Sequence, residues 1–235
     1  MTTTTIKKIT HENLLTLEAY AKVCPEYRAK AIAYKWLRSV HVGDHVTLLF
    51  EDETTVRYQI QEMLRIEKTF EQAGIQDELD AYNPLVPNGR NFKATMLIEY
   101  ADENERRVAL TKLKGIEDKT WVQVEGCARV HAIADEDLPR ENDTKTSAVH
   151  FLRFELSDEM AAALKYGVSL AMGVDHPQYT ARVDVSSETR AALAADLRWR
   201  PDDIDWRELL LTSNFWRPGA RNGISIDRPG PNLLH

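Results

Sequence analysis

Apolar side chains recur at every third or fourth position in several stretches of the chain, a pattern that predicts amphipathic helices. Residues 10–38 form the first such stretch, which is interrupted at Pro25, and residues 55–73 form the second, which we expect to end at Gly74. The apolar stripe of the second stretch consists of Val56, Ile60, Met63, Leu64 and Phe70. Shorter helices are predicted over residues 102–115, 157–167 and 187–197.

Other stretches alternate between apolar and polar residues or form short apolar runs, as β-strands do. The predicted strands cover residues 46–50, 93–100, 121–125, 129–134, 147–156, 168–174 and 180–185. Gly126 and Cys127 are expected to join two of them in a hairpin. Because the strands alternate in polarity and follow no strict βαβ rhythm, the predicted fold class is α+β, with a largely antiparallel sheet and flanking helices.

The composition of the chain changes after Leu197. The last 38 residues contain three of the five tryptophans, four of the nine prolines and six arginines, but no lysine. We therefore expect residues 1–197 to form a single α+β domain. Residues 198–235 are expected to form an extended C-terminal arm that packs through Trp199, Trp206 and Trp216.

Overall composition excludes several classes of protein. The chain has 235 residues and a net charge of −7, and it contains no basic cluster, so nucleic acid is not an expected partner. No apolar run approaches the ~20 residues that span a membrane, and the first residues lack the apolar core of a signal peptide. Cys24 and Cys127 stand in no metal-binding or redox spacing. We expect a cytoplasmic protein with two reduced thiols.

Glu67 is anomalous because it falls within the predicted apolar stripe of the second helix. Burying an unpaired carboxylate costs several kcal/mol or forces it to take up a proton. We therefore expect Glu67 to be buried and paired. The partner is a salt-bridging arginine, such as Arg65, Arg106 or Arg153, or a group in a functional site.

Two histidines are candidates for metal binding. His150 lies on a predicted strand and shares its apolar face with Ala148, Leu152 and Phe154, so a role in the core competes with one as a ligand. His176 follows Asp175 in a turn after an apolar strand, and an aspartate beside a histidine can orient the imidazole or bind the same ion.

The sequence thus favours a metal site made of His150, Asp175, His176 and Glu67. Imidazole and carboxylate ligands suit iron, zinc or manganese. Because the strands of the two histidines are separated by a short helix, we expect them to be neighbours in a sheet.

An enzyme is the alternative interpretation. In it Glu67 is the general base for a small acidic or amide substrate, and Arg153 binds the anionic group. Gln59 and Glu62 share a face of the same predicted helix and would complete the substrate site, although Glu62 also suits a solvated surface. No phosphate-cradling glycine loop occurs, so no nucleotide cofactor is expected.

Several strings of the sequence together resemble an uncharacterised bacterial family, the domain-of-unknown-function family 3501. The resemblance covers about residues 5–197. The strings are Leu-Leu-Phe-Glu-Asp at 48–52, Tyr-Gln-Ile-Gln-Glu-Met-Leu-Arg at 58–65, Leu-Asp-Ala-Tyr-Asn-Pro-Leu-Val-Pro at 79–87, Lys-Ala-Thr-Met-Leu-Ile-Glu-Tyr at 93–100, Ser-Ala-Val-His-Phe-Leu-Arg-Phe-Glu-Leu at 147–156 and Gly-Val-Asp-His-Pro-Gln-Tyr at 173–179.

Members of this family are often encoded beside rubrerythrin-like proteins and iron–sulfur oxidoreductase subunits. The resemblance therefore implies an accessory protein of an iron-linked redox or peroxide-stress system, which binds a metal ion or one of these partner proteins. It assigns no catalytic residues. A structural interaction module is a third interpretation, and a homo-oligomer is compatible with all three.

Overall fold

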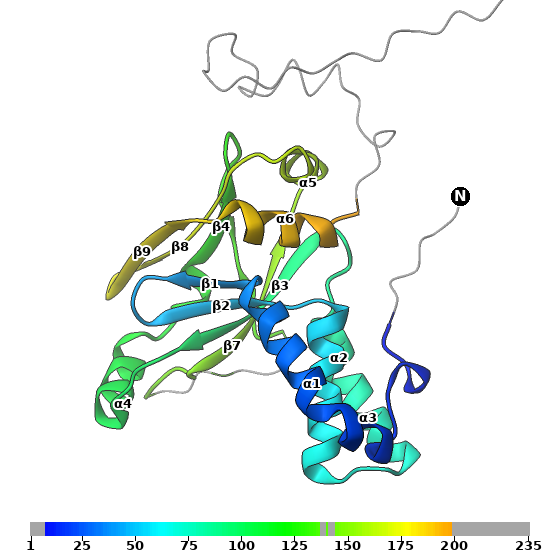
Figure 1. Cartoon of the computed structure of the whole chain (residues 1–235). Helices are drawn as coiled ribbons and strands as arrows, with labels where there is room; N and C mark the ends of the chain where they lie inside the picture. The colour runs from blue at the N-terminus through cyan, green and yellow to red at the C-terminus, as the bar shows by residue number, and fades with distance from the viewer. Residues whose placement is uncertain (1–7, 137–139, 141–143, 199–235) are drawn as a thin grey trace, which may run out of the picture. The chain divides into compact units, whose positions relative to one another are not determined.

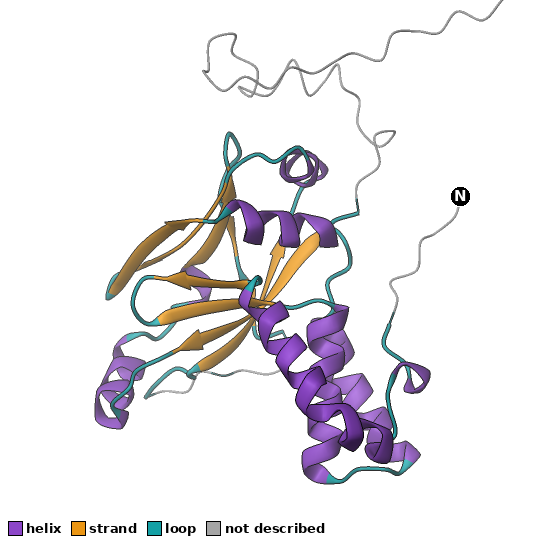
Figure 2. Cartoon of the chain, viewed as in Figure 1, coloured by secondary structure: helices purple, strands orange, loops and turns teal. Residues whose placement is uncertain are grey.

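The structure, a computed structural model, describes residues 8–136, 140 and 144–198. Its strands form two sheets, and every strand pair in them is antiparallel. Helices lie beside the sheets and do not alternate regularly with the strands (Figure 2). The predicted α+β class is therefore confirmed, with two sheets in place of one.

The first sheet has five strands in the order β1-β2-β3-β7-β6. Their bounds are Ser39–Val42 for β1, Val46–Phe50 for β2, Asn91–Ile98 for β3, Val149–Glu155 for β7 and Ile133–Ala134 for β6. The second sheet has four strands in the order β5-β4-β8-β9. These are Val130–His131 for β5, Thr120–Val124 for β4, Leu170–His176 for β8 and Tyr179–Asp184 for β9.

The two sheets share one hydrophobic core. Inward-facing residues of the first sheet, such as Leu48 and Phe154, belong to the same buried cluster as Val122 and Met172 of the second. The predicted hairpin at Gly126-Cys127 is confirmed, because β4 pairs with β5. After Ala132 the chain passes into β6 and so crosses from the second sheet to the first. At the other edge, β1 contacts β8 and β9.

Helices α5 (Asp158–Lys165) and α6 (Ser187–Asp196) pack against this core through Met160, Leu164 and Leu193. Helices α1 (Leu17–Trp36), α2 (Glu53–Glu67) and α3 (Gln72–Tyr82) form a separate helical layer (Figure 1). Its smaller core contains Val56, Ile60, Leu64, Ile75 and Leu79. The remaining elements are α4 (Glu103–Lys112) and three short 3₁₀ helices, η1 (His11–Asn13), η2 (Asn83–Leu85) and η3 (Glu117–Lys119).

The predicted interruption at Pro25 is wrong, since α1 runs through it from Leu17 to Trp36. A proline within a helix leaves the carbonyl four residues earlier without its N–H donor. Here that carbonyl belongs to Ala21, and both residues are exposed, so water can replace the missing donor. Thr16 is the N-cap of this helix, and its side chain accepts a hydrogen bond from the Ala19 N–H at 3.2 Å.

The end of the second predicted helix is also wrong. Helix α2 ends at Glu67, because Lys68 adopts a left-handed conformation with φ 56° and turns the chain. Gly74 lies inside the next helix, α3. The apolar stripe is therefore buried only as far as Leu64, and Phe70 lies 74% exposed.

Arg38 connects the helical layer to the sheets. It follows Leu37, the C-cap of α1, and is 1% exposed. Its guanidinium donates hydrogen bonds to the carbonyl oxygens of Phe50 (3.0 Å) and Glu51 (3.3 Å), and it forms an ion pair with Asp196 at the end of α6. Asp52, the N-cap of α2, lies 3.6 Å away.

The predicted arm over residues 198–235 lies, apart from Arg198, outside the described residues, as do its three tryptophans. Among the described helices, none has the length and apolar character needed to cross a membrane. Cys24 and Cys127 are both free thiols and partly buried.

Trp121 packs on the outer side of the second sheet against a glycine. It stands opposite Gly173 in the pairing of β4 with β8 and is completely buried. A Cβ atom at position 173 would lie 2.3 Å from Cζ2 of Trp121 and 2.7 Å from the carbonyl oxygen of Ala181. The Arg129 guanidinium covers the ring, 3.9 Å from its centroid. Gly173 is thus required by the close approach of the indole.

We predict that Gly173→Ala lowers the free energy of unfolding by about 2–3 kcal/mol, because the added methyl group overpacks this contact. Chemical denaturation would measure the loss. Combining Gly173→Ala with Trp121→Ala should cost less than the sum of the two single changes, since the smaller side chain removes the contact of the methyl group with the indole and leaves only the one with the Ala181 carbonyl. Additive losses would contradict the proposed contact.

Candidate metal centre

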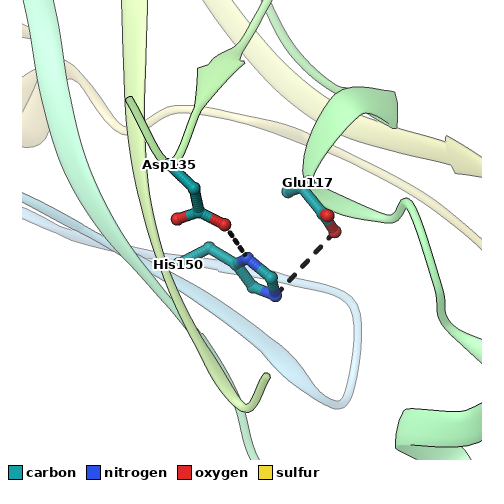
Figure 3. Close-up of side chains that lie close together, drawn as sticks. All are labelled: Glu117, Asp135 and His150. Atoms are coloured by element: carbon teal, nitrogen blue, oxygen red, sulfur yellow. Dashed lines mark hydrogen bonds and ion pairs between the residues drawn. The ribbon is translucent and has the colours of Figure 1, made fainter. Parts of the chain in front are cut away.

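Three side chains from distant parts of the chain meet at one end of the first sheet. They are Glu117 of η3, Asp135 directly after β6, and His150 of β7 (Figure 3). Each can offer one ligand atom, and these atoms lie within 4.8 Å of one another. Within the described residues this is the one group of at least three histidine, cysteine or acidic residues so arranged.

β7 places His150 in the core. The strand alternates as predicted, so that His150, Leu152 and Phe154 are buried, and His150 is completely inaccessible. It lies opposite Met96 of β3. The sequence-based prediction of a core-facing histidine is thus confirmed.

Asp135 is held against β7 by its backbone and its side chain. Its N–H donates to the Phe151 carbonyl (2.9 Å), and its Oδ1 accepts from the Phe151 N–H (3.0 Å). The residue has φ 47°, a left-handed conformation that aspartate tolerates better than most residues. Arg140 forms an ion pair with the same Oδ1 at 3.1 Å and lies over the ring of Phe151. The carboxylate is therefore fixed before any ligand binds.

The two carboxylates face different nitrogens of the imidazole. Oδ2 of Asp135 lies 2.6 Å from Nδ1 of His150, whereas Oε2 of Glu117 lies 3.8 Å from Nε2 (Figure 3). Nε2 also lies 2.9 Å from Oγ1 of Thr146 and 3.1 Å from the Ser147 carbonyl oxygen. Glu117, Thr146 and His150 are all buried, so these contacts form away from bulk water.

This arrangement matches the way in which proteins orient a metal-binding histidine. Such a histidine usually donates one ring N–H to a carboxylate and binds the ion through its other nitrogen. Here Asp135 would hold the ring through Nδ1 and leave Nε2 as the ligand atom. Metal bonds to nitrogen and oxygen are about 2.1 Å long, so the 3.8 Å between Nε2 and Oε2 leaves room for an ion that His150 and Glu117 would hold.

The same contacts also suit a protonated imidazole. Both ring nitrogens face oxygen atoms that can accept a hydrogen bond, namely Asp135 on one side and the Ser147 carbonyl on the other. A buried imidazolium between two carboxylates would be a purely structural ion-pair network. The cluster therefore has two possible occupants of Nε2, a metal ion and a proton.

Of the four residues predicted to bind metal, only His150 belongs to this cluster. His176 is buried in the second sheet, where Nε2 contacts the Lys114 carbonyl (3.0 Å) and Nδ1 accepts from the Gln178 N–H (3.2 Å). Asp175 forms an ion pair with Arg129. The expectation that the two histidine strands are neighbours is wrong, because β7 and β8 lie in different sheets.

Glu67 is exposed, which corrects the prediction that it is buried and paired. Its helix ends at this residue, so the apolar stripe does not continue around it. Glu62 is the buried carboxylate of α2, although the sequence favoured a solvated surface for it. It accepts hydrogen bonds from Tyr20 (2.5 Å) and from two nitrogens of Arg65 (3.2 and 3.0 Å), and the Cys24 sulfur lies 3.7 Å away.

The predicted substrate residues are occupied by other contacts. Arg153 forms ion pairs with Glu136 (2.6 Å) and Glu155. Gln59 is half-buried and lies beside Tyr82. Glu62 contacts α1 as described above, so no contact among the described residues joins these three side chains into a substrate site.

Glu117 and Asp135 were missed by the sequence analysis. Asp135 begins a polar, acidic stretch that is typical of a solvated loop, and Glu117 stands two positions after Gly115, where the preceding helix was predicted to end. Neither has an apolar periodicity around it. Only the pairing of β6 with β7, which the two-residue β6 cannot reveal in sequence, brings Asp135 to His150.

Comparison with known proteins agrees with the resemblance seen in the sequence. The family model "Protein of unknown function (DUF3501)" matches residues 8–197, and the chain therefore belongs to this family. It is also similar to a crystal structure of a novel protein of unknown function from Burkholderia pseudomallei K96243. The two share 56% identity and a TM-score of 0.78 over 81% of this chain and 100% of the other. No curated protein matches the chain.

Glu62 gives a pH-dependent prediction. The hydrogen bonds from Arg65, followed in importance by the one from Tyr20, lower the pKa of Glu62 against the opposing effect of burial. A carboxyl whose pKa is lower in the folded state stabilises the protein above its unfolded pKa of about 4.3. That stabilisation is lost as the pH falls through the lower, folded value.

We therefore predict that Glu62→Gln lowers the free energy of unfolding by about 1–2 kcal/mol at pH 7. The difference from the wild type should shrink below pH 4, when the wild-type carboxyl also takes up a proton. Urea denaturation at pH 7 and again below pH 4 would measure this difference in the free energy of unfolding. Glu67→Gln, at the exposed end of the same helix, is the matched control and should change the stability by less than about 0.5 kcal/mol. Equal effects of the two changes would contradict the conclusion that Glu62 is the buried and paired carboxylate of α2.

Proposed function

We propose that the protein binds a divalent transition metal through His150 Nε2 and Glu117, with Asp135 orienting the imidazole. The observation that carries this proposal is the placement of the two carboxylates on different ring nitrogens, at 2.6 Å and 3.8 Å. Thr146 Oγ1 and the Ser147 carbonyl oxygen lie close enough to Nε2 to add oxygen ligands. One imidazole nitrogen with several oxygens suits iron, manganese or zinc.

We further propose that this metal protein serves an iron-linked redox or peroxide-stress system in the cytoplasm. The gene neighbours implied by the family resemblance support this setting and suggest rubrerythrin-like or iron–sulfur oxidoreductase proteins as partners. Two free thiols in the structure are consistent with a reducing compartment. The enzyme interpretation has less support, because Glu67 is exposed and Arg153 is paired with two glutamates.

Metal content and metal-dependent stability test the proposal. We predict that protein purified without chelators or metal-affinity resins contains iron, manganese or zinc by elemental analysis. After removal of the metal, adding one of these ions back should raise the melting temperature, because a ligand of the folded state stabilises it by about 2.7 kcal/mol at 100 times its Kd. Ferrous iron would be tested without oxygen.

Variants separate the three roles. Glu117→Gln and His150→Gln should abolish the metal-dependent rise in melting temperature, whereas Asp135→Asn should weaken metal binding about 10- to 100-fold, as expected of an orienting group. His176→Gln is the matched control, since it changes a buried histidine outside the cluster, and it should keep the rise. If the wild-type protein carries no metal and none of the three ions changes its melting temperature, the cluster is a structural ion-pair network.

A further inference from the structure

A pocket of about 480 Å³ lies where α4 meets the end of β3 and the start of β7. The residues that line it include Leu97 of β3, Glu99 and Tyr100 just beyond that strand, Val149 of β7 and Arg106 of α4. Protein sites for small organic ligands have volumes of about 300–1,000 Å³. The pocket is therefore large enough for a small molecule, and the described residues that line it include none of the proposed metal ligands.

Apolar side chains line the pocket on the side of the sheet. Leu97 and Val149 stand opposite each other in the pairing of β3 with β7, and Val149 is 37% exposed. Tyr100 lines the same pocket, and its ring is held by stacking on the His45 imidazole, with the two ring centroids 3.9 Å apart. These side chains offer the nonpolar part of a ligand an apolar surface whose position is fixed before the ligand binds.

Two opposite charges line the pocket without neutralising each other. Arg106 is half-buried, and its guanidinium forms no hydrogen bond or ion pair with any residue that the structure describes. The Glu99 carboxylate accepts a hydrogen bond from the Thr47 hydroxyl at 2.6 Å, which leaves its other oxygen without a partner among the described residues. An arginine and a carboxylate that can reach each other usually form paired hydrogen bonds. Here they present separate charges to the same pocket.

The surrounding charges select among possible ligands. Glu103 and Glu105 belong to the first turn of α4, and with Glu99 they give three carboxylates near the pocket. Arg106 and Arg107 supply two positive charges, so the surroundings stay acidic and repel a ligand whose only charge is a carboxylate. A ligand whose only charge is an ammonium would leave Arg106 unpaired. A ligand that carries both charges satisfies Arg106 and Glu99 together.

From these features we infer that the pocket binds a free α-amino acid with an apolar side chain. Arg106 holds the α-carboxylate through its fork of N–H donors, and Glu99 accepts hydrogen bonds from the α-ammonium group. The apolar side chain of the ligand lies against Leu97, Val149 and Tyr100. Because the pocket is open to solvent, we expect a modest Kd of about 0.1–1 mM. This inference is independent of the proposed metal centre.

NMR titration of the isotope-labelled, full-length chain with L-leucine tests the inference. Leucine should shift a limited set of resonances and saturate them with the expected Kd. L-Leucinamide keeps the ammonium group but lacks the carboxylate, whereas 4-methylpentanoate keeps the carboxylate but lacks the ammonium group. Each should bind at least about 10-fold more weakly than leucine, because each loses one of the two charged contacts.

Variants assign the two charged contacts. Arg106→Gln and Glu99→Gln should each weaken leucine binding at least about 10-fold. Arg106→Gln should not weaken the binding of L-leucinamide any further, because that ligand has no carboxylate for Arg106 to hold. Arg107→Gln and Glu103→Gln are the matched controls, since they remove neighbouring charges of α4 that do not line the pocket, and both should bind leucine like the wild type.

Two results would overturn the inference. One is the absence of any saturable shift with L-leucine or L-phenylalanine up to about 10 mM. The other is a wild-type chain that binds 4-methylpentanoate or L-leucinamide as tightly as leucine, since one charge of the ligand would then be enough for recognition.

Discussion

The buried guanidinium of Arg38 is the interaction on which the arrangement of the helical layer depends. A guanidinium taken out of water costs several kcal/mol unless its donors are satisfied. Arg38 meets this requirement with two carbonyl oxygens around β2 and a carboxylate on α6, while Asp52 begins α2 nearby. Since Arg38 also follows the C-cap of α1, its side chain fixes both helices against the first sheet and α6. Tyr34, on the last turn of α1, donates a hydrogen bond to Asp52 and strengthens the same junction.

The helical layer lies outside the two sheets, and apolar side chains fill the space between the sheets. The His150 cluster lies at the margin of this apolar space. The crossing from β5 to β6 brings Asp135 beside β7, and η3 brings Glu117 in from the start of β4. Each acidic residue reaches the histidine because the chain changes sheet near it. The cluster is thus a consequence of how the two sheets are joined, and its residues come from three separate segments.

The sequence predicted those features that depend on neighbours along the chain. The alternation of β7 predicted that His150 faces the core, and the Gly126-Cys127 turn predicted a hairpin. Features that depend on contacts between distant segments could not be predicted in this way. Glu67 was predicted to be buried because the apolar stripe was extended past Lys68. The left-handed conformation of Lys68 turns the chain there, and nothing in the local sequence indicates it. Glu62 seemed exposed because its partner, Tyr20, lies on another helix.

The two possible occupants of Nε2 exclude each other, because a metal ion and a proton use the same lone pair of the imidazole. Asp135 suits both of them, since its Oδ2 lies 2.6 Å from Nδ1 and can accept a hydrogen bond from it in either case. Two other oxygens distinguish the occupants. The Glu117 carboxylate, 3.8 Å from Nε2, leaves room for an ion, whereas the Ser147 carbonyl, at 3.1 Å, can accept a hydrogen bond directly from the ring nitrogen. Metal binding by this cluster therefore depends on which of these two oxygens Nε2 engages.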